Sequence, residues 1–367
     1  MPDATGEAGA FRESVAAALP AEPDARVVWQ RLGRAGLLEV VLDDPGEGGA
    51  ALLDQLLAEL DARLPLGVVL SVCVQVATAL PLLREMAGRS PLATDVLARA
   101  LRGDVVVALA VTDAGAPGSW LLDAATAMCE TGDGIVLSGG KDWITNACRC
   151  DHALVLARHR PARHFTSFRW LLVPAGAAGV SSRSATGALF AGSAVGHLRF
   201  DDVRLRPEHL VGPPGRGLAQ FARHVGRERL AGALWARSLC RRVLGDTRRF
   251  LVARRGPDGS LWDSAAIRER FARCLVELHR IDALCVVQTR DEGARDGAAM
   301  MLKAACGESV ERILTECVHL RGADAFRDGG EAVLRAEASM FGIAGGATGA
   351  MLAGIADRAQ ELLEACR

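Results

Sequence analysis

The sequence contains no tyrosine, only two lysines and a single asparagine in 367 residues. Its basic charge is therefore carried almost entirely by arginine. Lysine, asparagine and tyrosine share A/T-rich codons, so this composition is typical of a G+C-rich genome. Under such a bias, a lysine or asparagine that survives marks a position to examine. Lys141 and Asn146 both fall in one short segment, KDWITNA (141–147).

The sequence also lacks an excess of charge of either sign, with 43 basic and 44 acidic residues. Proteins that bind nucleic acid usually carry a basic excess or stripe, so we expect no nucleic-acid partner. Half of the residues are hydrophobic, which is enough for a large core and excludes global disorder. The length predicts two to three domains.

Signals for export and for metal binding are missing too. A signal peptide has a basic segment followed by an apolar stretch, and the polar N-terminus shows no such pattern. The ten cysteines are scattered without a CxxC pair, which favours reduced thiols in the cytoplasm. Cys148, Cys150 and His152 lie close together, but no second cluster with zinc-like spacing follows, so we expect no metal site.

One apolar run, residues 65–83, is about long enough to cross a bilayer. Polar residues lie inside it (Ser71, Gln75 and Thr78), Pro81 interrupts its end, and its flanks are not strongly basic. We therefore predict a helix buried inside a helical domain, and no membrane partner.

The pattern of apolar residues changes twice along the chain. Residues 1–105 show helical spacing, and residues 106–212 show short alternating segments separated by Gly, Asp and Pro turns. Residues 213–367 return to long helical patterns. We therefore predict an α+β multidomain protein. Its parts are an N-terminal helical domain, a middle β-barrel or sandwich, and a C-terminal domain like a four-helix bundle.

The predicted elements are as follows. We expect early helices at 11–19, 27–37 and 51–60. We expect strands at 124–130, 135–141, 153–157, 170–173, 180–183, 195–200 and 203–205, with a TGDG hairpin turn at 131–134 and a turn at FDD (200–202). Later helices are expected at 218–254, 263–290, 296–320, 330–342 and 347–366.

Several common motifs are absent: the GxGxxG dinucleotide fingerprint, the P-loop, HExxH and GxSxG. Five strings are present instead: LAVTDAGAPGSW (109–120), IVLSGGKDWITNACRCDH (135–152), VGHLRFDDVRL (195–205), LVGPPGRGLAQF (210–221) and GRERLAGA (226–233). In this order they resemble the acyl-CoA dehydrogenase family over nearly the whole chain. The WITNA string is the most specific, and Lys303 also falls where members often carry lysine.

The resemblance implies a flavoenzyme that oxidises an acyl thioester with FAD as cofactor. A base removes a proton next to the thioester carbonyl, and a hydride leaves the neighbouring carbon for flavin N5. The resemblance assigns FAD contacts to Val111, Thr112, Ser119, Trp143, Thr145, Arg255, Gly322 and Thr348. The alternative for Trp143 and Thr145 is an ordinary core aromatic and an ordinary strand residue.

The resemblance also indicates where the base lies. Most members carry it in a C-terminal YEGTxEI segment, but here IAGGATGAM (343–351) has Gly345 at that place. A second branch of the family places the base in the ERL helix, where this sequence has Glu228. Glu228 is therefore the expected base, with the neighbouring Arg229 at the substrate. The alternative is a solvent-facing glutamate in a charged run.

Trp235 follows Glu228 by seven residues, nearly two helical turns, so both side chains should leave one face of the helix. Family members usually have a small residue there. An indole would narrow the acyl cavity and favour a short, branched or bent chain. The alternative is that Trp235 packs into the helical bundle and does not meet the substrate.

Other strings depart from the family. The RxxFG motif keeps Arg255 but lacks the phenylalanine, and QxxGGxG keeps Gly322 but loses the glutamine and two glycines. These departures indicate a specialised branch, such as polyketide or other secondary metabolism, with an acyl group on CoA or on an acyl carrier protein. Other expected partners are an electron-transfer acceptor or oxygen, and further copies of the chain in a homodimer or homotetramer. The competing hypothesis is a non-catalytic, flavin-poor scaffold of the same fold.

Overall fold

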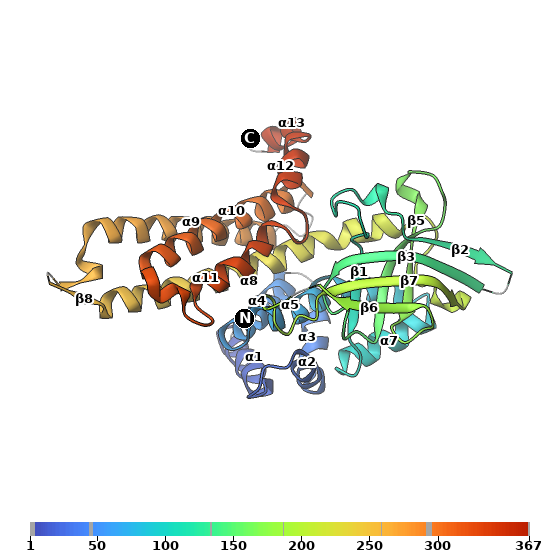
Figure 1. The fold of residues 1–367 in the computed structure, drawn as a ribbon, viewed down its shortest axis with the longest axis horizontal. Helices are drawn as coiled ribbons and strands as arrows, with labels where there is room; N and C mark the ends of the chain where they lie inside the picture. The colour runs from blue at the N-terminus through green and yellow to red at the C-terminus, as the bar shows by residue number, and fades with distance from the viewer. Residues whose placement is uncertain are drawn as a thin grey trace. The chain divides into compact units, whose positions relative to one another are not determined.

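The computed structural model describes residues 4–43, 47–132, 134–185, 187–257, 259–290 and 296–365. Helices come first, strands follow and helices return, which confirms the order predicted from the sequence (Figure 1). The chain divides into two compact units that cut across this order. The first combines residues 1–45 with 67–228, and the second combines residues 46–66 with 229–367.

The N-terminal helices are α1 (Ala4–Ala18), α2 (Ala25–Arg34), α3 (Leu37–Asp43), α4 (Glu47–Arg63), α5 (Leu66–Val74), α6 (Leu80–Ala87) and α7 (Pro91–Leu101). Local sequence sets their starts. The Asp24 carboxylate accepts from the backbone N–H groups of Arg26 and Val27 at the start of α2. The Ser90 hydroxyl does the same for Ala93 in α7, where Pro91 occupies the first turn.

The apolar run forms one continuous helical rod from Leu66 to Ala87, in which α5 and α6 are joined by a π-helical turn, η1 (Gln75–Ala79). The rod has the length and composition of a membrane span. However, 89% of its most apolar stretch is buried inside the protein. This burial agrees with the prediction of a core helix.

The strands form one mixed seven-stranded sheet. They are β1 (Val107–Ala110), β2 (Ala127–Thr131), β3 (Gly134–Ile144), β4 (His152–Arg158), β5 (Phe168–Pro174), β6 (Val180–Ser184) and β7 (Gly196–Leu205). The order is β1-β4-β2-β3-β7-β6, and β5 pairs with β4. The expected hairpin is present, because β2 pairs with β3 from Ala127↔Ser138 to Thr131↔Gly134.

The structure differs from the predicted elements in several places. The expected FDD turn is a bulge inside the single strand β7, where Asp202 adopts a φ of 46° and one extra residue is accommodated opposite β3. Strand β1, which pairs with β4 in parallel, was not predicted. The expected helix 347–366 is two helices, α12 (Thr348–Ala356) and α13 (Ala359–Ala365).

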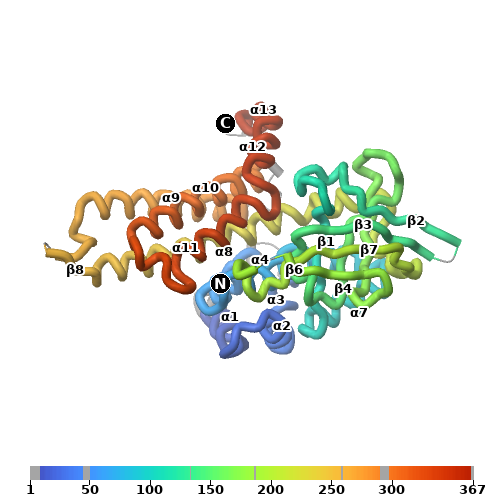
Figure 2. Tube along the Cα trace, in the orientation of Figure 1, coloured from blue at the N-terminus to red at the C-terminus, as the bar shows by residue number. Residues whose placement is uncertain are grey.

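The later helices are α8 (Gly217–Ala253), α9 (Ala265–Arg290), α10 (Asp296–Arg321) and α11 (Glu331–Ala338), with a small hairpin of β8 (Arg255–Gly256) and β9 (Gly259–Ser260) after α8. Short 3₁₀ turns fill several connections, among them η3 (Phe165–Ser167) and η6 (Gly322–Phe326). The residues of helix α8 up to Glu228 belong to the first unit, and its later residues belong to the second. Within the second unit, α9 and α10 run side by side (Figures 1 and 2).

A buried ion pair joins β3 to the loop that follows β1. The Lys141 Nζ of β3 lies 2.6 Å from Asp113 Oδ1, and both side chains are almost completely buried. Burial lowers the pKa of Lys141, while Asp113 opposes this shift. The second Asp113 oxygen accepts from the backbone N–H groups of Ala125 and Thr126. The pair thus fixes the loop after β1 against β3.

We predict that Asp113→Ala lowers the free energy of unfolding by about 3–5 kcal/mol, because it leaves the Lys141 charge buried without its counter-ion. Asp24→Ala, which removes a surface helix cap, should cost only about 0.5–2 kcal/mol. Urea unfolding followed by circular dichroism measures both. Equal losses in the two variants would contradict the role given to the buried pair.

Candidate active site

The KDWITNA segment ends β3 in a strained conformation. One extra residue is accommodated between Lys141 and Ile144 relative to β7, so the strand bulges there. Trp143 adopts a φ of 59° and Asn146 a φ of 68°, both in the left-handed region that few non-glycine residues occupy. Such strain costs about 1–3 kcal/mol and is concentrated at functional sites. The bulge leaves the Trp143 indole 64% exposed.

Two contacts join this segment to Val111 and Thr112, the predicted FAD contacts that follow β1. The Asp142 backbone N–H donates to the Thr112 carbonyl at 3.0 Å, and Lys141 Nζ donates to the Val111 carbonyl at 3.0 Å. The structure therefore brings Val111 and Thr112 next to the segment that carries Trp143. The Trp143 ring also lies edge-on to His197 of β7, with ring centroids 5.6 Å apart.

The remaining predicted residues of this unit differ in exposure. Thr112 and Thr145 are half-buried, Val111 is buried, and Ser119 is exposed in the loop that follows Asp113. Thr145 lies two residues beyond the exposed indole. An aromatic face and a nearby hydroxyl are thus both presented by the end of β3.

Asn146 connects this segment to the buried rod Leu66–Ala87. Its Oδ1 accepts from Ser71 Oγ at 2.5 Å, and its Nδ2 donates to the Ser71 carbonyl at 3.0 Å. The asparagine is 2% exposed. The single asparagine of the chain therefore both tolerates a left-handed backbone and satisfies a polar residue inside an apolar helix.

Glu228, the predicted base, is half-buried in α8 and contacts the same rod. Its Oε2 accepts from Thr78 Oγ1 at 3.0 Å, and Thr78 is completely buried in the π-helical turn η1. Cys73 faces the same carboxylate from α5. Burial, with a further contribution from the Glu228 charge, raises the pKa of the Cys73 thiol to about 12, so this neighbour is uncharged at neutral pH.

Three polar side chains of the rod therefore contact three different parts of the site. Ser71 binds Asn146, Gln75 accepts from the Val107 backbone N–H at the start of β1 at 3.0 Å, and Thr78 binds Glu228. Sequence reasoning noted these residues only as evidence against a membrane span. Their spacing of four and then three residues along an apolar run was the signal that could have identified them.

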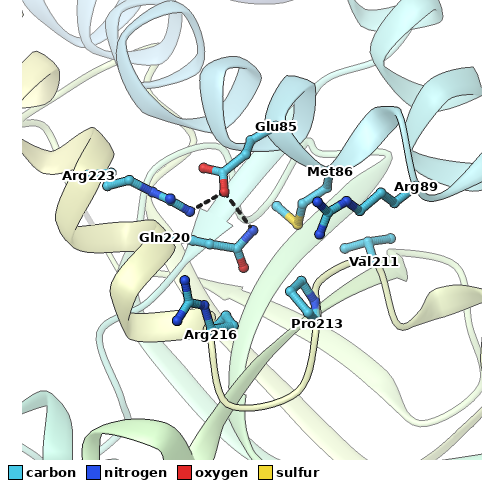
Figure 3. Close-up of a pocket in the computed structure, with 8 residues that line it drawn as sticks. All are labelled: Glu85, Met86, Arg89, Val211, Pro213, Arg216, Gln220 and Arg223. Carbon is cyan, nitrogen blue, oxygen red and sulfur yellow. Dashed lines mark hydrogen bonds and ion pairs between the residues drawn. The ribbon is translucent and has the colours of Figure 1, made fainter.

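Glu85 joins α6 to the start of α8 (Figure 3). Its carboxylate accepts from Gln220 Nε2 at 3.1 Å and from Arg223, and it lies 2.9 Å from His224 Nε2. A cavity of about 200 Å³ lies beside these contacts; it is lined by Glu85, Met86, Arg89, Val211, Pro213, Arg216, Gln220 and Arg223. The contacts of Glu85 are those of a structural bridge between two helices.

The second unit holds the other predicted FAD residues. Arg255 lies in β8 and Gly322, with a φ of 59°, begins η6; an ion pair of 3.3 Å between Arg254 and Asp324 links these two segments. Thr348 lies elsewhere, and its hydroxyl donates to the Gly342 carbonyl at 3.1 Å.

Thr348 and the pair of Arg255 and Gly322 lie near different parts of helix α10. A Cβ on Gly307 would lie 3.0 Å from the Thr348 hydroxyl, so Thr348 packs against the part of α10 near Gly307. Gly307 precedes Gly322 by 15 residues, or about 22 Å along a helix. The structure therefore does not bring Thr348 together with Arg255 and Gly322 within one chain.

Gly345 lies where the resemblance predicts the base of most family members. Gly345 has a φ of 69°, and its carbonyl accepts from Arg229 Nε at 3.3 Å. Arg229 is buried at 9% exposure. Lys303, the other rare lysine, is also buried and donates to the Phe341 carbonyl.

Trp235 is buried in the second unit at 1% exposure. Its indole N–H donates to Asp61 Oδ1 at 3.1 Å, and its ring lies edge-on to Phe341 with centroids 5.0 Å apart. Asp61 is also bound by Arg242. These contacts are the ones expected if Trp235 packs into the helical bundle and does not meet the substrate.

Two family sequence models match the chain. The one described as acyl-CoA dehydrogenase, middle domain, matches residues 108–203, and the one described as acyl-CoA dehydrogenase, C-terminal domain, matches residues 215–360. Together they cover more than half of the chain. Their boundary falls in the linker between the sheet and α8.

Known proteins give a consistent result. Acyl-(acyl-carrier-protein) dehydrogenase MbtN of Mycobacterium sp. (strain MCS) is 26% identical over 313 residues, which are 82% of this chain and 77% of that protein. The match to MbtN of Mycolicibacterium paratuberculosis is 28% identical and covers 67% of this chain and 63% of that protein.

Solved structures share the fold. Prolyl acyl carrier protein oxidase AnaB superimposes with a TM-score of 0.84 at 17% identity, over 96% of this chain and 98% of that chain. A glutaryl-CoA dehydrogenase from Mycobacterium smegmatis in complex with FADH2 gives a TM-score of 0.82 at 21% identity, over 96% of this chain and 94% of that chain. At these identities the likeness shows the fold alone.

We expect Asn146→Ala to lower the free energy of unfolding by about 2–4 kcal/mol, because it removes two hydrogen bonds and leaves Ser71 unsatisfied. Asn146→Gly removes the same bonds but adopts the left-handed φ easily. It should therefore be more stable than the alanine variant by about 1 kcal/mol. Chemical denaturation of both variants checks this order, and an alanine variant at least as stable as the glycine variant would refute the argument from φ.

Proposed function

Because this chain belongs to the acyl-CoA dehydrogenase family, we propose that it is an FAD-dependent dehydrogenase of acyl thioesters with Glu228 as its base. The observation that carries the proposal is the hydrogen bond between Thr78 and Glu228 in the first unit. It holds a half-buried carboxylate against a helix whose Ser71 and Gln75 bind the WITNA segment and β1. A solvent-facing glutamate in a charged run would not have a completely buried partner.

The residues at the end of β3 fit a flavin. The exposed Trp143 indole offers a planar face, and the half-buried Thr145 hydroxyl lies two residues further along. Val111 and Thr112 lie beside them, and the family resemblance adds Ser119, Arg255, Gly322 and Thr348. When bound, FAD supplies the two-electron acceptor that takes the hydride.

The protein's own residues supply the other half of the reaction. Glu228 accepts the proton from the carbon next to the thioester carbonyl as the C–H electron pair moves towards a new C=C bond. Glu228 is partly removed from solvent, and the Thr78 hydroxyl holds one of its carboxylate oxygens. Cys73, an uncharged thiol, adds no competing charge.

We propose that the acyl group is carried by an acyl carrier protein or by CoA in secondary metabolism. The relative MbtN is named as an acyl-(acyl-carrier-protein) dehydrogenase and AnaB as a prolyl acyl carrier protein oxidase, which supports the first carrier. The departures at Gly345 and around Gly322 support a specialised branch rather than general fatty-acid oxidation.

Further parts of the proposal rest on the family resemblance and on the sequence. The proposal of a short or unusual acyl chain rests on the sequence alone, because the Trp235 indole packs against Asp61 and Phe341. Arg229 is proposed as a further substrate contact. The protein forms a homodimer or homotetramer in the cytoplasm. An electron-transfer acceptor or oxygen reoxidises the flavin.

We predict that the purified protein binds one FAD per chain and that Trp143→Ala weakens binding about 3- to 12-fold. This range corresponds to the loss of one aromatic stacking contact. Because the indole is mostly exposed, the variant should fold normally. Phe165→Ala, which removes another exposed aromatic of the same unit, should leave affinity unchanged. Titration followed by flavin fluorescence measures all three, and an absence of saturable binding would favour the flavin-free scaffold.

We predict that Glu228→Gln lowers turnover about 10²- to 10⁴-fold while the fold and bound FAD remain, because a general base is lost. Glu85→Gln is the control, since the Glu85 carboxylate bridges α6 and α8 through its contacts with Gln220 and His224. Steady-state rates with acyl-CoA and acyl-carrier-protein thioesters measure the turnover of both variants. A Glu228→Gln variant as active as the control would return Glu228 to a structural role.

A further inference from the structure

Thr78 lies in a distorted turn for which the sequence gives a physical cause. Pro81 has no N–H, and its ring collides with the carbonyl one turn before it, so a regular helix cannot continue through this point. In η1 the Leu80 N–H donates instead to the Gln75 carbonyl, five residues back. Such wide turns are rare and frequently occur at functional sites.

The distorted turn matters because of what Thr78 does there. A threonine inside a helix commonly donates its hydroxyl to the carbonyl one turn before it. Thr78 donates instead to Glu228 Oε2, which is 150 residues away in sequence. Thr78 is 0% exposed, so the hydroxyl is removed from bulk solvent and takes its partner inside the protein.

We propose that Thr78 is a positioning residue that fixes the Glu228 carboxylate and keeps it ionised for proton abstraction. This inference rests on the proposed function. A hydroxyl that donates to a carboxylate stabilises its charged form and opposes the effect of burial, which favours the neutral form. It also restricts the rotation of the side chain, so that the base is held in one orientation before the substrate arrives.

Other charged or titratable groups near Glu228 bear on its ionisation. Arg227 and Arg229 flank it in sequence, and His224 precedes it by one turn and lies against Glu85. From the neighbouring helix, Cys73 faces it as a neutral thiol. None of these is altered by a substitution at Thr78, so a change in the ionisation of Glu228 would report the lost hydroxyl.

The experiment compares Thr78→Val, which keeps the shape of the side chain but removes the hydroxyl, with Thr78→Ser, which keeps the hydroxyl. The pKa of Glu228 is read without any substrate from an infrared titration of the carboxyl band, with the Glu228→Gln spectrum subtracted. The valine variant should raise this pKa by about one to two units, because a donor to the charged form is lost. The serine variant should restore the original value.

Turnover gives a second readout. The acidic limb of kcat/KM for acyl-CoA and acyl-carrier-protein thioesters should move to higher pH in Thr78→Val by the same amount and return in Thr78→Ser. Thr247→Val is the control, since it replaces an equally buried threonine further along α8. It should leave the acidic limb of kcat/KM at the wild-type pH.

The outcomes separate the two proposals. If Glu228→Gln is inactive but Thr78→Val keeps both the wild-type carboxyl pKa and the wild-type pH profile, Thr78 is only structural and the inference fails alone. If Glu228→Gln keeps full turnover, Glu228 is not the base and both proposals fail. If Thr78→Val does not fold, Thr78→Ala in the same infrared titration takes its place, and an unshifted carboxyl pKa there overturns the inference.

Discussion

The arrangement of the site depends on the hydrogen bonds made by three polar residues of one buried apolar rod, Leu66–Ala87. Ser71, Gln75 and Thr78 are its polar residues in contact with the site, and each satisfies its hydrogen-bonding groups on a different part of the protein. A buried polar group without a partner costs about 1–3 kcal/mol. The rod therefore fits only where the WITNA segment, the start of β1 and α8 all meet it, and the need to satisfy these groups fixes the geometry of the site.

The sheet contributes a second constraint. The buried pair of Lys141 and Asp113 fixes β3 against the loop after β1, and the bulge just beyond Lys141 turns the Trp143 indole outwards. A strained φ at Trp143 persists only because the residues on both sides are held, by the ion pair before it and by Asn146 after it. An exposed, rigid indole is thus a product of buried polar contacts.

The sequence predicted what is local and missed what is distant. Periodicity located most helices and strands, and the WITNA string indicated the segment that proves strained. The three rare residues Lys141, Asn146 and Lys303 are all buried. The contact between Thr78 and Glu228 spans 150 residues, and no local pattern reveals such a pairing. The π-helical turn and the bulges were also not predicted from the sequence, because they depend on how neighbouring strands and helices pack.

The most direct test of the account is rapid anaerobic mixing of the FAD-loaded protein with acyl thioesters of CoA and of an acyl carrier protein. The oxidised flavin absorbance should disappear in one phase. Deuterium on the carbon next to the thioester carbonyl should slow that phase if the proposed base, Glu228, removes this proton in the same step. A flavin that stays oxidised with every thioester, or a bleaching rate indifferent to deuterium, would contradict the central claim.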